Sequence, residues 1–153
     1  MEEKKPRQSS LKTSKECLFC QIISGKAESY PVFDDKDTFA FLDTSPVLFG
    51  HILLIPKKHY RYIAEIPDKT VGLLFCNAKL LARALEDALD ADGTLIAIND
   101  KVSQSKPHLH IHVIPRKFGD GFRGTFWPRY RYHSKEKIIK MQEKIKEALK
   151  SIK

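Results

Sequence analysis

The chain has 153 residues, enough for one domain with a real core, and its 42% hydrophobic and 30% charged residues are ordinary for a globular protein. No apolar run approaches the length of a membrane-spanning helix, and residues 1–14 lack the apolar core of a secretory signal, so we expect a cytoplasmic protein that does not enter the membrane. Three cysteines are too few for a disulfide framework, and the net charge of +8 indicates only a non-specific attraction for anions.

In chain order, residues 1–15 are expected to be disordered, and residues 17–24 to form a short helix that Gly25 ends in a left-handed conformation. Aromatic and aliphatic runs predict strands over 30–33, 37–43 and 51–55. A long helix is expected over 67–89, with Cys76 packed inside its apolar pattern. Its apolar residues recur at spacings of three and four, namely Val71, Leu74, Phe75, Ala78, Leu81, Ala82, Leu85 and Leu89.

Two more strands are expected over 94–99 and 107–115, and a last amphipathic helix over 134–152. Strands joined by short turns, with helices outside that series, predict an α+β fold on an antiparallel sheet of about five strands. We expect one domain over 16–133, with the helix of 134–153 packed on it. His133 is expected at the surface.

Three histidines alternate with aliphatic residues in the segment 107–115. His108, His110 and His112 would share one face of the strand, and Leu109 would point with the other aliphatics into the core. Neighbouring histidines would lie roughly 6.6 Å apart along the strand, so neighbours could share a metal ion, or the row could line an extended anion such as a polyphosphate. Imidazole is also a good nucleophile and acid or base near neutral pH.

The segment His108-Leu-His-Ile-His112-Val-Ile resembles the motif of the histidine triad (HIT) family, in which three histidines alternate with apolar residues. The resemblance extends upstream to 50–59 (GHILLIPKKH), to 39–43 (FAFLD) and to the CxxC segment 17–23, and is strongest to zinc-containing bacterial HIT proteins. It implies a HIT-like fold and a nucleotide hydrolase or transferase. Its substrate would be a nucleoside phosphoramidate or a dinucleoside polyphosphate, from which it would release a nucleoside monophosphate.

The resemblance also implies roles for individual residues. His110 would attack the α-phosphorus and form a nucleotidyl-histidine intermediate, which water then hydrolyses, with His112 and His51 assisting. Asp43 would hold the ribose hydroxyls of a nucleotide, with a purine as the expected base. The other implied nucleotide contacts are Phe19, Phe39 and Leu42 at the base and Asn99, Gln104 and Ser105 at the phosphates.

Cys17, Cys20, His59 and His108 match the four ligands of a structural zinc ion in the related bacterial proteins. The resemblance further implies a homodimer, with an interface at the long helix or at the glycine-containing loop after the triad. That loop carries Phe122, Phe126 and Trp127 and could equally be a lid on the substrate side.

The loop 99–107 departs from the family pattern, because it has no glycine and Asn99 stands only nine residues before His108. A catalytically weak nucleotide-binding regulator on the same fold is therefore the alternative function. A nucleic-acid-end processing protein is a third hypothesis, prompted by the basic termini. No recognition motif supports it, so we expect no specific nucleic-acid binding.

Overall fold

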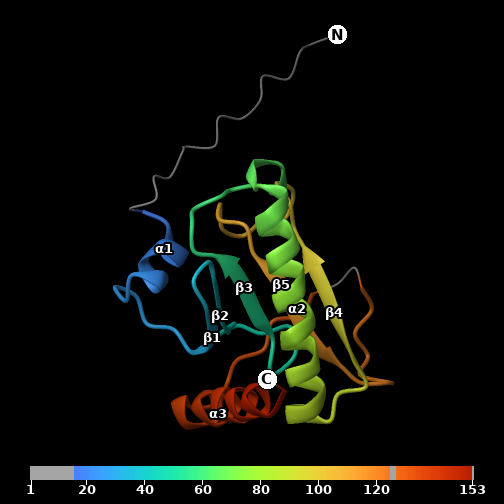
Figure 1. Cartoon of the computed structure of the whole chain (residues 1–153). Coiled ribbons are helices and arrows are strands. Elements are labelled where there is room, and N and C mark those ends of the chain that lie inside the picture. The colour runs from blue at the N-terminus through green and yellow to red at the C-terminus, as the bar shows by residue number, and fades with distance from the viewer. Residues whose placement is uncertain (1–15, 125–126, 153) are drawn as a thin grey trace.

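The computed structural model describes residues 16–124 and 127–152, and shows a five-stranded antiparallel sheet covered by helices (Figure 1). The strand order is β1-β2-β3-β5-β4, with every neighbouring pair antiparallel. The strands are β1 (Pro31–Asp34), β2 (Thr38–Leu42), β3 (Ile52–Pro56), β4 (Gly93–Ile98) and β5 (Ile111–Arg116), and the helices are α1 (Leu18–Ile23), the 3-10 turn η1 (Ile63–Glu65), α2 (Asp68–Leu89) and α3 (Lys135–Ile152). The α+β prediction is confirmed.

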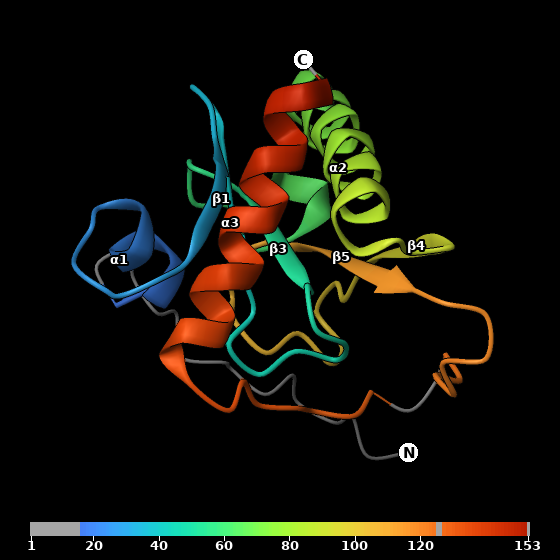
Figure 2. The ribbon, with the colours of Figure 1, turned by 90° about the horizontal axis from the view of Figure 1, so that it is seen from below.

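The helices divide the core into two layers. The long helix α2 packs on β3, β4 and β5, and α3 packs against α2 and β1 (Figure 2). A second apolar cluster lies where α1 contacts other side chains of the sheet, with Phe19 and Ile22 from the helix and Phe41 and Leu53 from the strands. The site described below lies in this second layer.

Local chemistry sets the ends of several elements. Gly25 follows α1 with φ +73°, as predicted, and Pro67 precedes the first turn of α2. Between β1 and β2, Asp35 accepts hydrogen bonds from the backbone and hydroxyl of Thr38. The buried amide of Asn77 on α2 then donates to both of these side chains. This network ties the β1–β2 turn to the long helix.

The prediction for Phe75 and Cys76 was wrong, because both side chains are exposed. The buried face of α2 carries Leu74, Asn77, Ala78, Leu81, Ala82, Ala84 and Leu85. At about 100° per residue, position 75 lies at the edge of that face, next to Ala82, and position 76 lies on the opposite side of the helix. His133 is exposed, as expected.

No helix within the described ranges is long and apolar enough to span a bilayer. The cytoplasmic location stays a prediction, as does the division at residue 133, although α3 does pack on the rest of the chain. The predicted extension 1–15 lies outside the described residues.

Candidate functional site

The histidine segment enters the sheet later than the sequence pattern predicts. β5 begins at Ile111, so His108 and His110 precede the regular strand. Pro107 has no N–H group to donate, and the N–H of Leu109 donates to the carbonyl of Tyr60 at 2.7 Å instead of to a neighbouring strand. The alternation of faces is nevertheless as expected: Leu109 and Ile111 lie in the core beneath α2, and the histidines face the layer of α1.

Hydrogen bonding determines which nitrogen of His110 carries the proton. His110 Nδ1 lies 2.8 Å from the carbonyl oxygen of His108, which can only accept, so Nδ1 donates. The pKa of His110 is lowered, chiefly by burial, so the ring is neutral near pH 7 and Nε2 keeps its lone pair. The ring of Phe19 meets this imidazole edge-on at 5.3 Å and restricts its orientation. His110 therefore presents an unprotonated nitrogen in a fixed direction.

His51 and His112 form a directed pair behind the nucleophile candidate. The backbone N–H of Val47 donates to His51 Nδ1 at 3.2 Å, so the His51 proton lies on Nε2 and is donated to His112 Nδ1 at 2.9 Å. His112 must then carry its own proton on Nε2. That atom is buried and has no hydrogen-bond partner among the described residues.

Asp43 offers a competing contact to His51, since Oδ2 lies 3.5 Å from Nδ1. One nitrogen cannot accept from Val47 and donate to Asp43 at the same time. Burial lowers the pKa of His51 well below its usual range, which favours the neutral ring that accepts. Burial also lowers the pKa of His112 to about 3, with further contributions from the positive charge of Arg129 and from repulsion between His112 and His110 when both are protonated. All three rings are therefore neutral at physiological pH.

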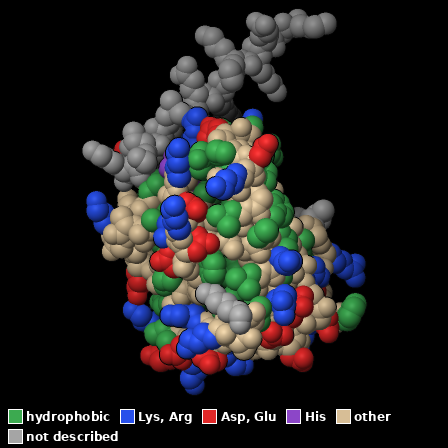
Figure 3. Space-filling model, viewed as in Figure 1, with side chains coloured by type: hydrophobic (Ala, Val, Ile, Leu, Met, Phe, Trp, Pro, Cys, Tyr) green, Lys and Arg blue, Asp and Glu red, His purple; other side chains and the backbone are tan. Residues whose placement is uncertain are grey.

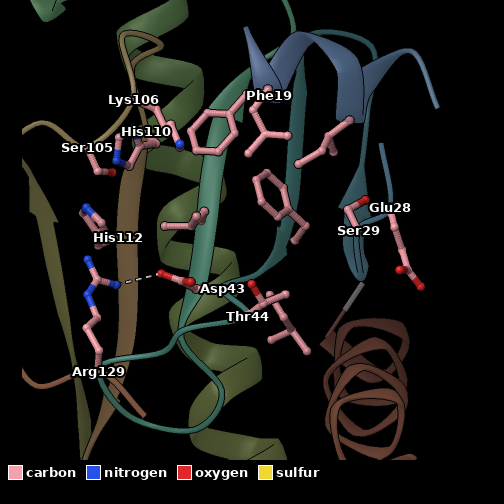
Figure 4. Close-up of a pocket in the computed structure, with 15 residues that line it drawn as sticks. Phe19, Glu28, Ser29, Asp43, Thr44, Ser105, Lys106, His110, His112 and Arg129 are labelled. Carbon is pink, nitrogen blue, oxygen red and sulfur yellow. Dashed lines mark hydrogen bonds and ion pairs between the residues drawn. The ribbon is translucent and has the colours of Figure 1, made fainter. Parts of the chain in front are cut away.

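A pocket of about 240 Å³ opens in front of His110 and His112 (Figure 4). Its remaining lining is Leu18, Phe19, Ile22, Glu28, Ser29, Phe41, Leu42, Asp43, Thr44, Leu53, Ser105, Lys106 and Arg129. One wall is apolar and comes from α1, β2 and β3, and polar groups gather by the histidines. Such a division suits a ligand with an aromatic part and an anionic part.

Asp43 stands between these two walls. Its Oδ1 accepts from the backbone N–H of Ser45 at 2.9 Å, and its Oδ2 accepts from Arg129 at 3.0 Å. Burial raises the pKa of this carboxyl, and the Ser45 and Arg129 contacts oppose that rise. A carboxylate has about four lone-pair positions, so Asp43 can still accept from a ligand diol.

Not every predicted nucleotide contact lies on this pocket. Phe19, Leu42, Asp43 and Ser105 line it, whereas Phe39, Asn99 and Gln104 do not, and neither does His51, which was predicted to assist His110. Phe39 packs in the apolar cluster under α1, and its neighbour Phe41 takes the pocket position. The side chain of Gln104 donates to the carbonyl of Arg61 at 2.7 Å, so this amide N–H is already engaged. His51 acts on the pocket only through His112.

Sequence reasoning missed Lys106 and Arg129, the two basic side chains on the pocket. Lys106 stands next to Ser105 in the predicted phosphate loop, and this position was a signal that could have identified it. Arg129 had no comparable signal, because it follows the triad by 17 residues in an irregular segment. Only the folding of that segment back over β5 brings it to the pocket.

The glycine-containing loop lies beside the same pocket. Trp127 meets His112 edge-on at 4.9 Å, and Phe122 is buried with Val47 and Ile114. Phe126 lies outside the described residues. Of the two interpretations offered by the sequence, these contacts favour a position on the substrate side.

A second group of side chains lies next to the triad. The ligand atoms of Cys17, Cys20, His59 and His108 all lie within 4.8 Å of one another. His108 Nε2 donates to the carbonyl of Pro56 at 2.8 Å, so its lone pair is on Nδ1, the nitrogen that faces the two thiols. Two sulfur and two imidazole ligands, with the His108 ring oriented by its hydrogen bond to Pro56, fit a tetrahedral zinc ion. Burial and the neighbouring Cys17 raise the pKa of Cys20 to about 11, so the thiolate that binds a metal is disfavoured on its own. A bound cation would stabilise that thiolate.

Fold and site together define a small α+β protein with a histidine-lined pocket beside a cysteine–histidine metal cluster. The pattern of the HIT domain family matches residues 24–119, and the chain belongs to this family. It is 41% identical over 114 residues to Protein hit of Bacillus subtilis, covering 72% of this chain and 78% of the relative. Adenosine 5'-monophosphoramidase of Candida albicans is 31% identical over 144 residues, 89% of this chain and 93% of the relative.

Solved structures agree with the fold. A zinc-bound histidine triad family protein from Mycobacterium smegmatis superimposes with a TM-score of 0.82 at 32% identity, over 92% of this chain and 97% of that chain. Both the long helix and the sheet are thus those of the family.

Proposed function

We propose that the protein is a nucleotide hydrolase or transferase that attacks the α-phosphorus of a nucleoside phosphoramidate or a dinucleoside polyphosphate. The observation that supports this most directly is the state of His110, whose Nδ1–H is committed to the carbonyl of His108 while Nε2 is free at the pocket. A neutral imidazole with one oriented lone pair is the form that covalent catalysis requires. The similarity to an adenosine monophosphoramidase agrees with this reaction class.

In the first step, His110 Nε2 forms a bond to the α-phosphorus, and the bond from phosphorus to the leaving group breaks. An oxyanion leaving group keeps the electron pair of that bond, and an amine leaving group uses it to take up a proton from water. The positive charge that develops on the ring is stabilised by the carbonyl of His108 at Nδ1. His51 orients the His112 ring through its hydrogen bond to Nδ1. The Nε2–H of His112, which has no partner among the described residues, can then donate to a phosphoryl oxygen. Water then attacks the nucleotidyl-histidine and releases the nucleoside monophosphate.

The nucleotide would lie across the two walls of the pocket. Asp43 would accept from the ribose hydroxyls, Phe19 and Leu42 would contact the base, and Ser105 would contact a phosphate. The apolar wall provides area for a purine. Phe39, Asn99 and Gln104 do not line this pocket, and their contacts with a nucleotide stay predictions.

Purified protein offered an AMP-amidate and diadenosine polyphosphates should release AMP, and rapid quenching should trap a nucleotidyl adduct on His110 by mass spectrometry. His110→Ala should show neither product nor adduct, while His133→Ala, at an exposed site, should behave as wild type. Retained AMP binding without turnover or adduct on any substrate would contradict the enzyme and favour the regulatory alternative.

We further propose that Cys17, Cys20, His59 and His108 hold a structural zinc ion. When bound, the ion would join α1 to the histidine segment and fix His108, whose carbonyl orients His110. Wild type and Cys76→Ser, a control at an exposed thiol, should carry about one zinc per chain, and Cys20→Ser should carry much less and unfold at a lower temperature. Equal zinc content in all three proteins would contradict this site.

A homodimer through the outer face of α2 is also proposed. β4 is an edge strand with Ile96 exposed, and Phe75 is 46% exposed on α2. On the face seen in Figure 3, hydrophobic side chains gather over α2 among charged ones. Sedimentation should give a dimer for wild type and a monomer for Phe75→Glu with Ile96→Lys. A monomeric wild type at micromolar concentration would contradict the interface.

A further inference from the structure

Two basic side chains stand at the two ends of the histidine pair. Lys106 comes from the loop before the triad and Arg129 from the segment after it, and both line the pocket with His110 and His112 (Figure 4). In the close-up, Lys106 lies beside His110, and Arg129 lies next to His112 and contacts Asp43. The two cations therefore flank the pair of histidines from opposite sides, in front of which the phosphoryl group and its leaving group would lie.

Arg129 is held in place but retains donors for a ligand. The N–H of its neighbour Tyr130 donates to the carbonyl of Pro46 at 2.8 Å, which fixes the backbone of this segment. Arg129 Nη1 donates to Asp43 and to the carbonyl of Ser45, each at 3.0 Å. The N–H groups on Nη2 and Nε have no partner within the described part of the chain, and the side chain is 47% exposed. Arg129 can therefore bind an anion while it keeps its contact with Asp43.

The pocket has more positive than negative charge available. Its two acidic residues are both paired, Asp43 with Arg129 and Glu28 with Lys135 outside the pocket. Lys106 has no ion pair within the described ranges. Because the Gln104 amide is bonded to the carbonyl of Arg61, the loop presents the cation of Lys106 at the pocket, where the neutral amide of Gln104 was expected.

Building on the proposed function, we propose that Lys106 and Arg129 together bind an anionic group attached to the α-phosphoryl group. The enzyme would then prefer substrates whose leaving group is an oxyanion, such as a phosphate ester or a sulfate, over those that release a neutral amine. The His110 Nε2–phosphorus bond forms, the phosphorus–oxygen bond breaks, and the electron pair departs on the oxyanion. Cations placed where this charge develops stabilise the transition state more than the bound substrate.

The test compares kcat/KM for three adenylates that share the AMP part: diadenosine triphosphate, adenosine 5'-phosphosulfate and AMP-morpholidate, whose leaving group is an amine. The variants are Arg129→Gln and Lys106→Gln, with Arg131→Gln as the matched control, because Arg131 is exposed and does not line the pocket. In each pocket variant, the ratio of kcat/KM for an oxyanion substrate to that for the morpholidate should fall by about tenfold or more, as expected for a lost charged hydrogen bond. Arg131→Gln should keep the wild-type ratio, and Arg129→Lys should recover part of it.

The two oxyanion substrates show whether phosphate, sulfate or both are recognised, and a fall of either ratio supports the proposal. An equal loss on all three substrates, or a changed ratio in only one of the two pocket variants, overturns the joint site. If either of these results came with His110-dependent turnover of the morpholidate, the proposed function would still be supported. If the wild type turned over none of the three substrates, both the joint anion site and the proposed function would be contradicted.

Discussion

Acidification should destabilise this protein through its buried histidines, and His112 allows the effect to be calculated. Burial lowers its pKa from the ordinary 6.5 to about 3. Below pH 6.5 the unfolded chain binds a proton that the native chain does not, so stability is lost as the pH falls from 6.5 toward 3. One pKa unit corresponds to about 1.4 kcal/mol, so His112 alone should lower the free energy of unfolding by about 2 kcal/mol between pH 7 and pH 5.

Urea unfolding followed by far-UV circular dichroism at pH 7 and pH 5 measures this loss. His112→Gln removes the titrating ring, and His133→Gln removes an exposed histidine as the control. Wild type and His133→Gln should each lose about 2 kcal/mol more on acidification than His112→Gln does. Comparing each protein with itself removes any difference in stability at pH 7. If His112→Gln lost as much as the wild type, the neutral, buried state of His112 would be refuted.

Three further substitutions test the packing, each by the shift in urea midpoint. Gly50 has φ +96°, and an added Cβ would lie 2.5 Å from Leu89 Cδ1, so Gly50→Ala should lower the free energy of unfolding by about 1–3 kcal/mol. The control Gly72→Ala, in open space on α2, should not destabilise the protein, and equal effects of the two substitutions would contradict this prediction. Asn77→Ala removes the amide that donates to the Asp35 carboxylate and the Thr38 hydroxyl, and should lower the free energy of unfolding by about 1–3 kcal/mol. An unchanged stability would mean that water replaces the Asn77 amide. Leu81→Ala, at a fully buried position, should cost about 2–5 kcal/mol, and a loss below that range would indicate that the core collapses around the gap.

Periodicity in the sequence predicted the elements well wherever burial follows a local repeat. The long helix was expected over 67–89 and is found over Asp68–Leu89, and the apolar stripe of the last helix is buried at Ile138, Ile145 and Leu149. The errors came where long-range contacts override the local pattern. Phe75 is apolar but lies off the packed face, and His108 bonds to the carbonyl of Pro56 in a segment that was expected to be regular strand.

The functional site also has features that the sequence predicted and features that only the tertiary structure decided. The resemblance of its motifs pointed to the family, to His110 as the histidine that would attack and to the four side chains proposed to bind zinc, because these depend on residue types at fixed spacing. Only the tertiary structure assigned the proton of His51 to Nε2 and that of His112 to Nε2, since the assignment starts from the N–H of Val47 and crosses between β3 and β5. It also placed the amide of Gln104 on the carbonyl of Arg61 and the side chain of Arg129 at the pocket. The positions of these protons and side chains depend on contacts between residues far apart in the chain, which no local pattern in the sequence encodes.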